Sequence, residues 1–268
     1  MSLKVTVLGS GTSHGVPMIG CDCAVCRSND PRDTRTRPSI LVERVPADAP
    51  SVSPWARAIR SILVDTSTDL RTQALTAGVR HVDAILYTHS HADHIFGLDE
   101  VRRFNVLQRE SIPCYADART MTDLRRAFPY IFAPSPQDGG GIPQVTPFVI
   151  GGAFSLGDLD VIPVPLWHGR RPILGFRFGA FAYLTDCSAV PDASWPLLED
   201  LDVLILDALR HRPHPTHFSV GEALAVVSRL RPRATYFTHI CHDLPHAATC
   251  AALPEGVELA YDGLILEI

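Results

Sequence analysis

The segment THSHADH holds a dense group of side chains that bind metals. His89, His91, Asp93 and His94 fall within six positions, directly after the apolar run DAILY. Alternate residues of an extended segment point the same way, so His89 and His91 can share one metal ion. If the chain then enters a helix, Asp93 and His94 turn toward a second ion. A polar strand end with incidental histidines is the alternative, but this pattern after one apolar strand favours a metal centre.

A second group of potential ligands lies near the start of the chain, in the segment GCDCAVC. Cys21, Cys23 and Cys26 follow the strand-like run LKVTVLG. A tetrahedral structural zinc needs four ligands, and zinc motifs typically supply a second cysteine or histidine pair. The chain has no second CxxC pair. If these thiols bind zinc, the fourth ligand comes from elsewhere in the chain; buried thiols in a turn are the alternative.

Short apolar runs rich in β-branched residues alternate with amphipathic segments along the chain. The runs predict strands at 3–9, 39–41, 61–65, 83–89, 159–166, 181–186, 202–209, 234–240 and 264–268. The amphipathic segments predict helices at 67–78, 98–110, 118–128 and 219–232. Hairpin-like pairs at 154–164 and 175–186 are mixed with strand–helix units, which favours mixed sheets over a doubly wound α/β fold.

The organisation of the chain favours a single domain over residues 1–268. Two loops, 44–57 and 133–144, have the composition of insertions. No internal repeat and no linker-like segment divides the sequence.

The composition excludes several classes of function. The formal net charge of −5 argues against a broad basic surface for nucleic acid. No apolar run approaches the roughly 20 residues of a membrane helix, and the N-terminus lacks the pattern of a secretory signal. Seven cysteines in such a chain indicate a reducing compartment, where clustered thiols bind metals. We therefore expect a cytoplasmic protein.

The HxHxDH segment resembles the defining motif of the metallo-β-lactamase superfamily. This resemblance implies an α/β fold, the four-layer αβ/βα sandwich, and three further ligands, each at a strand end. The sequence has matching residues in order: His168 after VIPVPLW, Asp186 in YLTDC and His239 after ATYFT. The implied assignment places His89, His91 and His168 on one divalent ion, Asp93, His94 and His239 on the other, and Asp186 on both.

Two further patterns resemble one branch of that superfamily, the cyclic-phosphate phosphodiesterases of bacterial phosphonate breakdown. They are GxxxGVPxxGCxCxxC near the start and THIxH near the end. The resemblance implies hydrolysis of a 5-phosphoribosyl 1,2-cyclic phosphate, active-site manganese or zinc, and a homodimer. It also implies that His242 is the fourth ligand of a structural zinc with Cys21, Cys23 and Cys26.

The same match implies residues that act on substrate. His217 resembles the non-ligand catalytic histidine of the family, with His211 and His214 as neighbouring competitors. Asp93, as part of a complete two-metal site, also takes part in catalysis. The loop GSGTSHGVP places Ser13 and His14 beside the metals, where they could contact substrate; a generic glycine turn with an exposed histidine would give the same pattern.

The sequence therefore predicts a two-metal phosphodiesterase for a small cyclic or nucleotide-like phosphoester. Two alternatives share the fold: a tRNA-processing nuclease of the ribonuclease Z type, and the pyrroloquinoline quinone biosynthesis protein that also carries a cysteine zinc site. The acidic net charge weighs against the nuclease. The complete ligand set favours hydrolysis over the quinone-cofactor role.

Overall fold

The computed structural model describes residues 2–45, 61–133 and 141–268, and within them two seven-stranded sheets pack face to face. The first has the order β14-β1-β2-β3-β4-β5-β6 and the second β13-β12-β11-β10-β9-β8-β7. Most of the two predicted insertions, 46–57 and 134–140, lies outside the described residues.

The strands of the first sheet are β1 (Ser2–Gly9), β2 (Ser39–Val45), β3 (Ser61–Val64), β4 (Ala84–Leu86), β5 (Ile112–Ala116), β6 (Val145–Val149) and β14 (Ile265–Glu267). Those of the second are β7 (Phe154–Leu156), β8 (Leu159–His168), β9 (Arg171–Phe178), β10 (Phe181–Leu184), β11 (Val203–Asp207), β12 (Ala234–Thr238) and β13 (Val257–Leu259). In each sheet the strands of one half run antiparallel and those of the other half run parallel. The parallel strands are β3 to β6 in the first sheet and β10 to β13 in the second.

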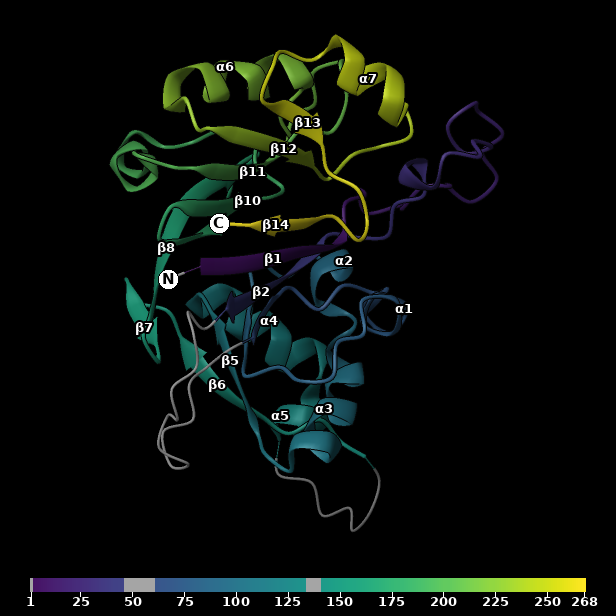
Figure 1. Cartoon of the computed structure of the whole chain (residues 1–268). Helices are drawn as coiled ribbons and strands as arrows, with labels where there is room; N and C mark the ends of the chain where they lie inside the picture. Colours follow the sequence, from purple (N-terminus) through teal and green to yellow (C-terminus); the bar gives the residue numbers. More distant parts are fainter. Residues whose placement is uncertain (1, 46–60, 134–140) are drawn as a thin grey trace.

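Helices cover the outer face of each sheet, which gives four layers (Figure 1). Helices α6 (Val220–Leu230) and α7 (His246–Ala252) lie on the second sheet. The first sheet is covered by α1 (Leu70–Thr76), α2 (Ala92–Ile95), α3 (Val101–Gln108), α4 (Ala118–Ala127) and α5 (Pro129–Phe132). Short 3-10 turns lie at Pro31–Asp33, Leu98–Glu100 and Asp192–Leu198. This arrangement confirms the predicted αβ/βα sandwich.

The alternation of side chains along the strands produces these layers. In β3, Ile62 and Val64 belong to the core between the sheets, whereas Leu63 belongs to the core under the helices. In β11, Ile205 faces the other sheet and Leu204 faces the helix layer. A strand covered on both faces is apolar throughout, which explains the continuous runs seen in the sequence.

The structure contains strands that the sequence analysis did not predict, chiefly β5 and β6. Both contain a proline, Pro113 in β5 and Pro147 in β6, and proline weakens a strand prediction because it cannot donate to the ladder. Pro147 is tolerated because β6 is an edge strand, and Pro113 is the second residue of β5. The predicted helices are all present, and α6 begins with a capping box formed by Ser219 and Glu222.

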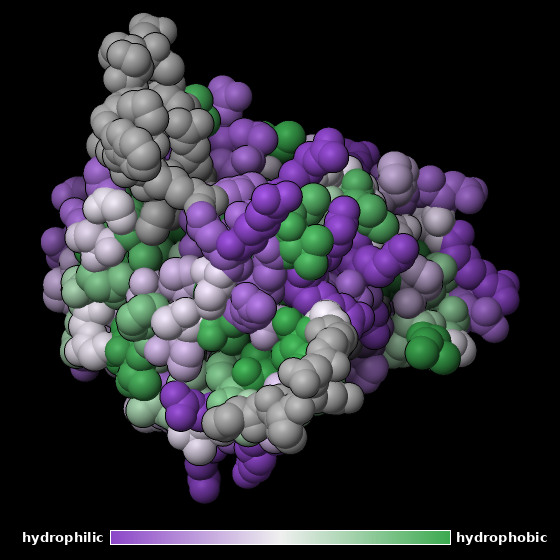
Figure 2. Space-filling model, turned by 90° about the horizontal axis from the view of Figure 1, so that it is seen from below, coloured by the Kyte–Doolittle hydropathy of each residue, from purple (hydrophilic) through white to green (hydrophobic). Residues whose placement is uncertain are grey.

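Among the described residues, no helix combines the length and the apolar character needed to cross a bilayer. On the coloured part of the face seen in Figure 2, hydrophobic residues are interleaved with hydrophilic ones. Scattered exposed apolar side chains of this kind are ordinary on a folded protein.

Candidate metal centre and active site

Four of the predicted ligands lie at or just after the carboxyl ends of strands, three of which belong to the parallel parts of the sheets. His89 follows β4, His168 is the last residue of β8, Asp186 follows β10 and His239 follows β12. The carboxyl ends of parallel strands lie at one edge of a sheet, which is where α/β proteins bind ligands. Asp186 and His239 have positive φ, +57° and +58°, an uncommon conformation for residues other than glycine. The backbone thus turns sharply at the points where these side chains enter the site.

The first cluster brings together His89, His91, His168 and Asp186, whose ligand atoms all lie within 4.8 Å of one another. His89 Nε2 is 3.0 Å from His91 Nδ1 and 3.5 Å from a carboxylate oxygen of Asp186. His89, His168 and Asp186 are buried, and His91 is half-buried. One metal ion could contact all four side chains.

The second cluster brings together Asp93, His94, Asp186 and His239, all buried, and again within 4.8 Å. Asp186 Oδ1 is 3.2 Å from His94 Nε2 and 2.9 Å from His239 Nε2. Asp93 Oδ2 lies 3.5 Å and 3.6 Å from the same two nitrogens. The chain enters α2 at Ala92, as the sequence analysis required for Asp93 and His94 to turn toward a second ion. Asp186 is the only member of both clusters.

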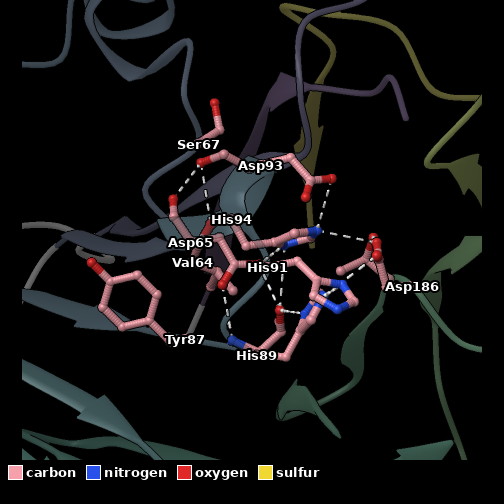
Figure 3. A network of polar contacts seen from close by, with 12 residues as sticks. Val64, Asp65, Ser67, Tyr87, His89, His91, Asp93, His94 and Asp186 are labelled. Atoms are coloured by element: carbon pink, nitrogen blue, oxygen red, sulfur yellow. Dashed lines mark hydrogen bonds and ion pairs between the residues drawn. The ribbon is translucent and has the colours of Figure 1, made fainter. Parts of the chain in front are cut away.

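A buried aspartate that the sequence analysis missed orients His94 (Figure 3). Asp65 Oδ2 lies 2.7 Å from His94 Nδ1, and Asp65 also accepts hydrogen bonds from the backbone and hydroxyl of Thr88. Figure 3 shows His94 between Asp65 on one side and Asp93 and Asp186 on the other. A carboxylate behind a metal-ligating histidine fixes its tautomer and raises its basicity. The available signal was an aspartate directly after the buried run SILV.

A second support fixes the turn between His89 and His91. Ser90 Oγ donates to Asp123 Oδ2 at 2.5 Å, and Arg171 Nη2 donates to Ser90 Oγ at 2.5 Å. The three residues come from α4, from β9 and from the motif itself. This network holds the extended geometry that lets the two histidines point to one ion.

Charge and burial oppose each other in the second cluster. Burial favours the neutral form of Asp186, but the His239 and His94 imidazoles hold the pKa of its carboxyl well below the usual range. Burial likewise disfavours the charged form of His239, but Asp186 raises the pKa of that imidazole to about 10. Without a metal, protons on the histidines therefore balance the carboxylates, and a bound cation would displace them.

The first cluster differs because burial dominates there. It lowers the pKa of His168 to about 4 and the pKa of His89 well below its usual value. Both imidazoles are thus neutral, the form that binds metals.

Unsatisfied buried atoms show that these residues fit a metal. Within the described part of the chain, Asp93 Oδ2, His94 Nε2 and His239 Nε2 are buried, and although they lie near oppositely charged groups, none of them makes a well-aligned hydrogen bond. Buried polar atoms are normally paired, so a group of orphaned atoms aimed at one point calls for an ion or water. Imidazole and carboxylate donors suit zinc, manganese or iron. The two clusters are therefore consistent with two divalent cations.

His217 lies beside the clusters and is held by a second buried aspartate that the sequence analysis missed. Its Nδ1 is 2.9 Å from Oδ2 of Asp207, the last residue of β11. Its ring stacks on His239 at 4.6 Å between centroids and lies 4.8 Å from His168. Since Asp207 occupies Nδ1, the Nε2 side of the ring is available to a substrate. The geometry fits the predicted non-ligand role.

The cysteine cluster meets His242, as predicted. Nδ1 of His242 lies 3.2, 3.3 and 3.7 Å from the sulfurs of Cys21, Cys23 and Cys26. With Zn–S near 2.3 Å and Zn–N near 2.0 Å, tetrahedral geometry separates sulfur from nitrogen by about 3.5 Å. The backbone N–H of Cys26 lowers the pKa of the Cys23 thiol to about 6, which favours the thiolate that zinc binds. Burial raises the pKa of Cys26 to about 11. The four side chains, all half-exposed, fit a structural zinc.

The predicted substrate loop is exposed near His217. Ser13 and His14 are exposed, and together with His217 they line a cavity of about 250 Å³. The loop is tied down at Ser13, whose carbonyl accepts from Arg37 Nε at 3.2 Å. Of the competing histidines, His214 also lines this cavity, whereas His211 is exposed and does not.

Comparison with known proteins assigns the family. Residues 60–240 match the model of the beta-lactamase superfamily domain. The crystal structure of a new diphosphatase from the PhnP family is 46% identical, covers 100% of this chain and 98% of its own, and superposes with a TM-score of 0.89. The chain belongs to the PhnP family of the β-lactamase superfamily. This membership confirms the resemblance stated from the sequence and, with the two ligand clusters, makes the protein a metal-dependent hydrolase.

Two relatives of this PhnP-family chain are named for activities other than phosphoester hydrolysis. An octanoyltransferase of Porphyromonas gingivalis is 34% identical over 98% of this chain and 51% of its own length, so the chain spans about half of that relative. The coenzyme PQQ synthesis protein B of Cupriavidus necator is 30% identical and covers 97% of this chain and 98% of its own.

Proposed function

We propose that this protein is a two-metal phosphodiesterase that hydrolyses a small cyclic phosphate, with 5-phosphoribosyl 1,2-cyclic phosphate as the leading candidate. The observation that carries the proposal is the pair of ligand clusters joined by Asp186, with His217 beside them. Manganese or zinc in such a pair supplies an acidified water and neutralises phosphoryl charge. His89, His91, His168, Asp93, His94, Asp186 and His239 would hold the two ions.

The side chains of the site have distinct roles in this proposal. Asp186 fixes the separation of the two clusters because it contributes to both. Asp93, buried in the second cluster, adds a second carboxylate to that of Asp186 for the cation bound there. His217 donates a proton from Nε2 to the leaving oxygen, while Asp207 stabilises the imidazolium through Nδ1. Burial of the ligands excludes bulk water from this side of the reaction.

A second candidate is cleavage of a phosphoanhydride, because the structure at 46% identity is described as a diphosphatase. The same ligand set would serve both reactions. They differ in the leaving group: a phosphate leaves with less need of protonation than a sugar hydroxyl, so His217 would contribute less to anhydride cleavage.

The test is hydrolysis of a substrate panel by one preparation whose metals have been quantified. The panel contains 5-phosphoribosyl 1,2-cyclic phosphate, a 2′,3′-cyclic nucleotide, bis(p-nitrophenyl) phosphate, a nucleoside diphosphate and precursor tRNA. We expect the highest kcat/KM for the phosphoribosyl cyclic phosphate. Preference for the nucleoside diphosphate would support phosphoanhydride cleavage. Cleavage of precursor tRNA would support the ribonuclease Z alternative. No hydrolysis of any phosphoester by the metal-loaded protein would contradict the proposal and favour a role in quinone-cofactor synthesis.

A further inference from the structure

The cavity beside His217 has three walls from distant parts of the chain. The first wall is Thr12–Gly15 and Met18 from the loop after β1, and the second is Leu209, Arg210, Arg212 and His214 from the loop after β11. Residues 241–243, beyond β12, form the third. Its volume of about 250 Å³ is at the small end for ligand sites, which suits a compact group rather than a polymer. His217 lines it, so the cavity continues directly from the reaction site.

The charges in this cavity leave one arginine uncompensated. Asp243 lines the wall, but its Oδ2 pairs with Arg212 Nη2 at 3.0 Å. Arg210 lines the same wall and donates only to the carbonyls of Arg212 and Pro213, at 3.3 and 3.2 Å. Among the residues that the structure describes, no carboxylate lies within ion-pair distance of Arg210. Its positive charge is therefore available to an anion.

The two donors of this wall are held in place before any ligand arrives. The backbone of Arg210 bridges to Ser219, and its carbonyl accepts from Val220 N–H at 2.9 Å. His214 Nδ1 accepts from Thr216 N–H at 3.4 Å and lies 3.1 Å from the Thr216 hydroxyl. A nitrogen that accepts from a backbone N–H carries no proton, so the proton of a neutral His214 is on Nε2. Arg210 and His214 thus both present N–H donors from a fixed loop.

We infer that this cavity is an anion subsite that binds a second, non-reacting phosphate of the substrate through Arg210 and His214. The inference rests on the proposed function and adds to it the residues that would bind the second phosphate of such a substrate. The reacting phosphorus lies at the metal clusters, and the second phosphate lies on the far side of His217. Guanidinium groups are suited to phosphate because their donors match its oxygens.

The experiment compares two substrates that differ only in that phosphate: 5-phosphoribosyl 1,2-cyclic phosphate and ribosyl 1,2-cyclic phosphate. For the metal-loaded wild-type protein we expect kcat/KM to be higher for the phosphorylated substrate by about 10- to 100-fold, the value of a hydrogen bond to a charged group. In Arg210→Gln the ratio between the two substrates should fall toward one. The matched control is Arg103→Gln, which removes an exposed arginine of α3 away from the cavity and should keep the wild-type ratio.

The outcomes separate the subsite from the reaction. If both substrates are hydrolysed and Arg210→Gln keeps the wild-type ratio, the subsite is wrong and the proposed function stands. If neither substrate is hydrolysed, the proposed function fails. The subsite is then tested by itself, by measuring the affinity for ribose 5-phosphate by calorimetry. Binding at least about tenfold tighter to wild type than to Arg210→Gln would support it, and equal or absent binding would overturn it.

Discussion

The cysteine knuckle (Cys21, Cys23, Cys26 and His242) and the buried His/Asp clusters are built on opposite principles. The knuckle gathers four half-exposed side chains, mostly thiols, on loops outside the sandwich. In Figure 1 the purple loop that follows β1 extends away from the sheets on the side of α7. The His/Asp clusters gather buried imidazoles and carboxylates at strand ends.

His239 and His242 show how closely the two regions are connected. They are three residues apart, yet His239 faces the buried cluster and His242 faces the knuckle. A site with four protein ligands is closed and suits a structural metal, whereas shared and open coordination suits catalysis. The comparison indicates that one segment secures both the fold of the N-terminal loop and the reaction centre.

The largest expected effect is that of removing the residue common to both buried clusters. Asp186→Ala should reduce active-site metal from about two equivalents to well below one and abolish turnover, because each ion loses a ligand. Metal analysis after gel filtration, with kcat on the preferred substrate, checks this. Asp192→Ala, at an exposed aspartate, is the control. Near-normal metal content and activity in Asp186→Ala would show that Asp186 does not bridge the two clusters.

The next effect concerns His217, which we expect to be catalytic without binding metal. His217→Ala should lower kcat by about 10²–10⁴-fold with metal content unchanged, the usual worth of a general acid. The defect should shrink for a nitrophenolate leaving group, which needs little protonation. The exposed neighbour gives the control variant, His211→Ala.

Two results would revise that role of His217. Its ligand atoms and those of Asp207 and His239 also lie within 4.8 Å of one another, as a metal site requires. Loss of an ion from His217→Ala would therefore make it a ligand. An equal defect with good and poor leaving groups would leave phosphate positioning as its function.

A smaller effect on metal binding is expected for Asp65, which contacts the ligand His94. Asp65→Asn removes the carboxylate that faces His94 Nδ1 but keeps the size of the side chain. The affinity of the second cluster, which contains His94, for its ion should fall by about 10- to 100-fold, the usual cost of losing such a partner. Competition with a chelator measures it, and the knuckle of the same variant serves as the internal control. Unchanged affinity would show that Asp65 serves the fold alone.

The smallest effect on catalysis is expected at the knuckle. Cys23→Ser should lose about one equivalent of zinc and lower the melting temperature, because metal binding is coupled to folding. The buried site should keep its metals below the new melting temperature. Cys250→Ser, at a half-buried cysteine outside the knuckle, should keep all the zinc. A full zinc complement in Cys23→Ser would rule out the structural site.

The sequence by itself determined the chemistry of the first ligands. The spacing in THSHADH suffices to place His89 and His91 on one side of an extended segment and Asp93 and His94 beyond a turn, because local geometry fixes their directions. The strand runs and helix starts likewise indicated mixed sheets with amphipathic helices, because the apolar pattern shows which faces are buried. The four-layer arrangement was implied by the resemblance to the superfamily. The main failures were β5 and β6, each a short strand with one proline, because the pairing of the sheet overrides local preference there.

Tertiary structure alone decided which distant residues meet. Parallel strand ends bring Asp186 and His239 to the motif, and His242 reaches Cys21 across 221 positions. Asp65 and Asp207, which support His94 and His217, resemble any aspartate after an apolar strand. Their roles depend on an imidazole placed 2.7 or 2.9 Å away by the packing of the sheets. No periodicity encodes such a distance, because it arises from the register of two strands rather than from either one.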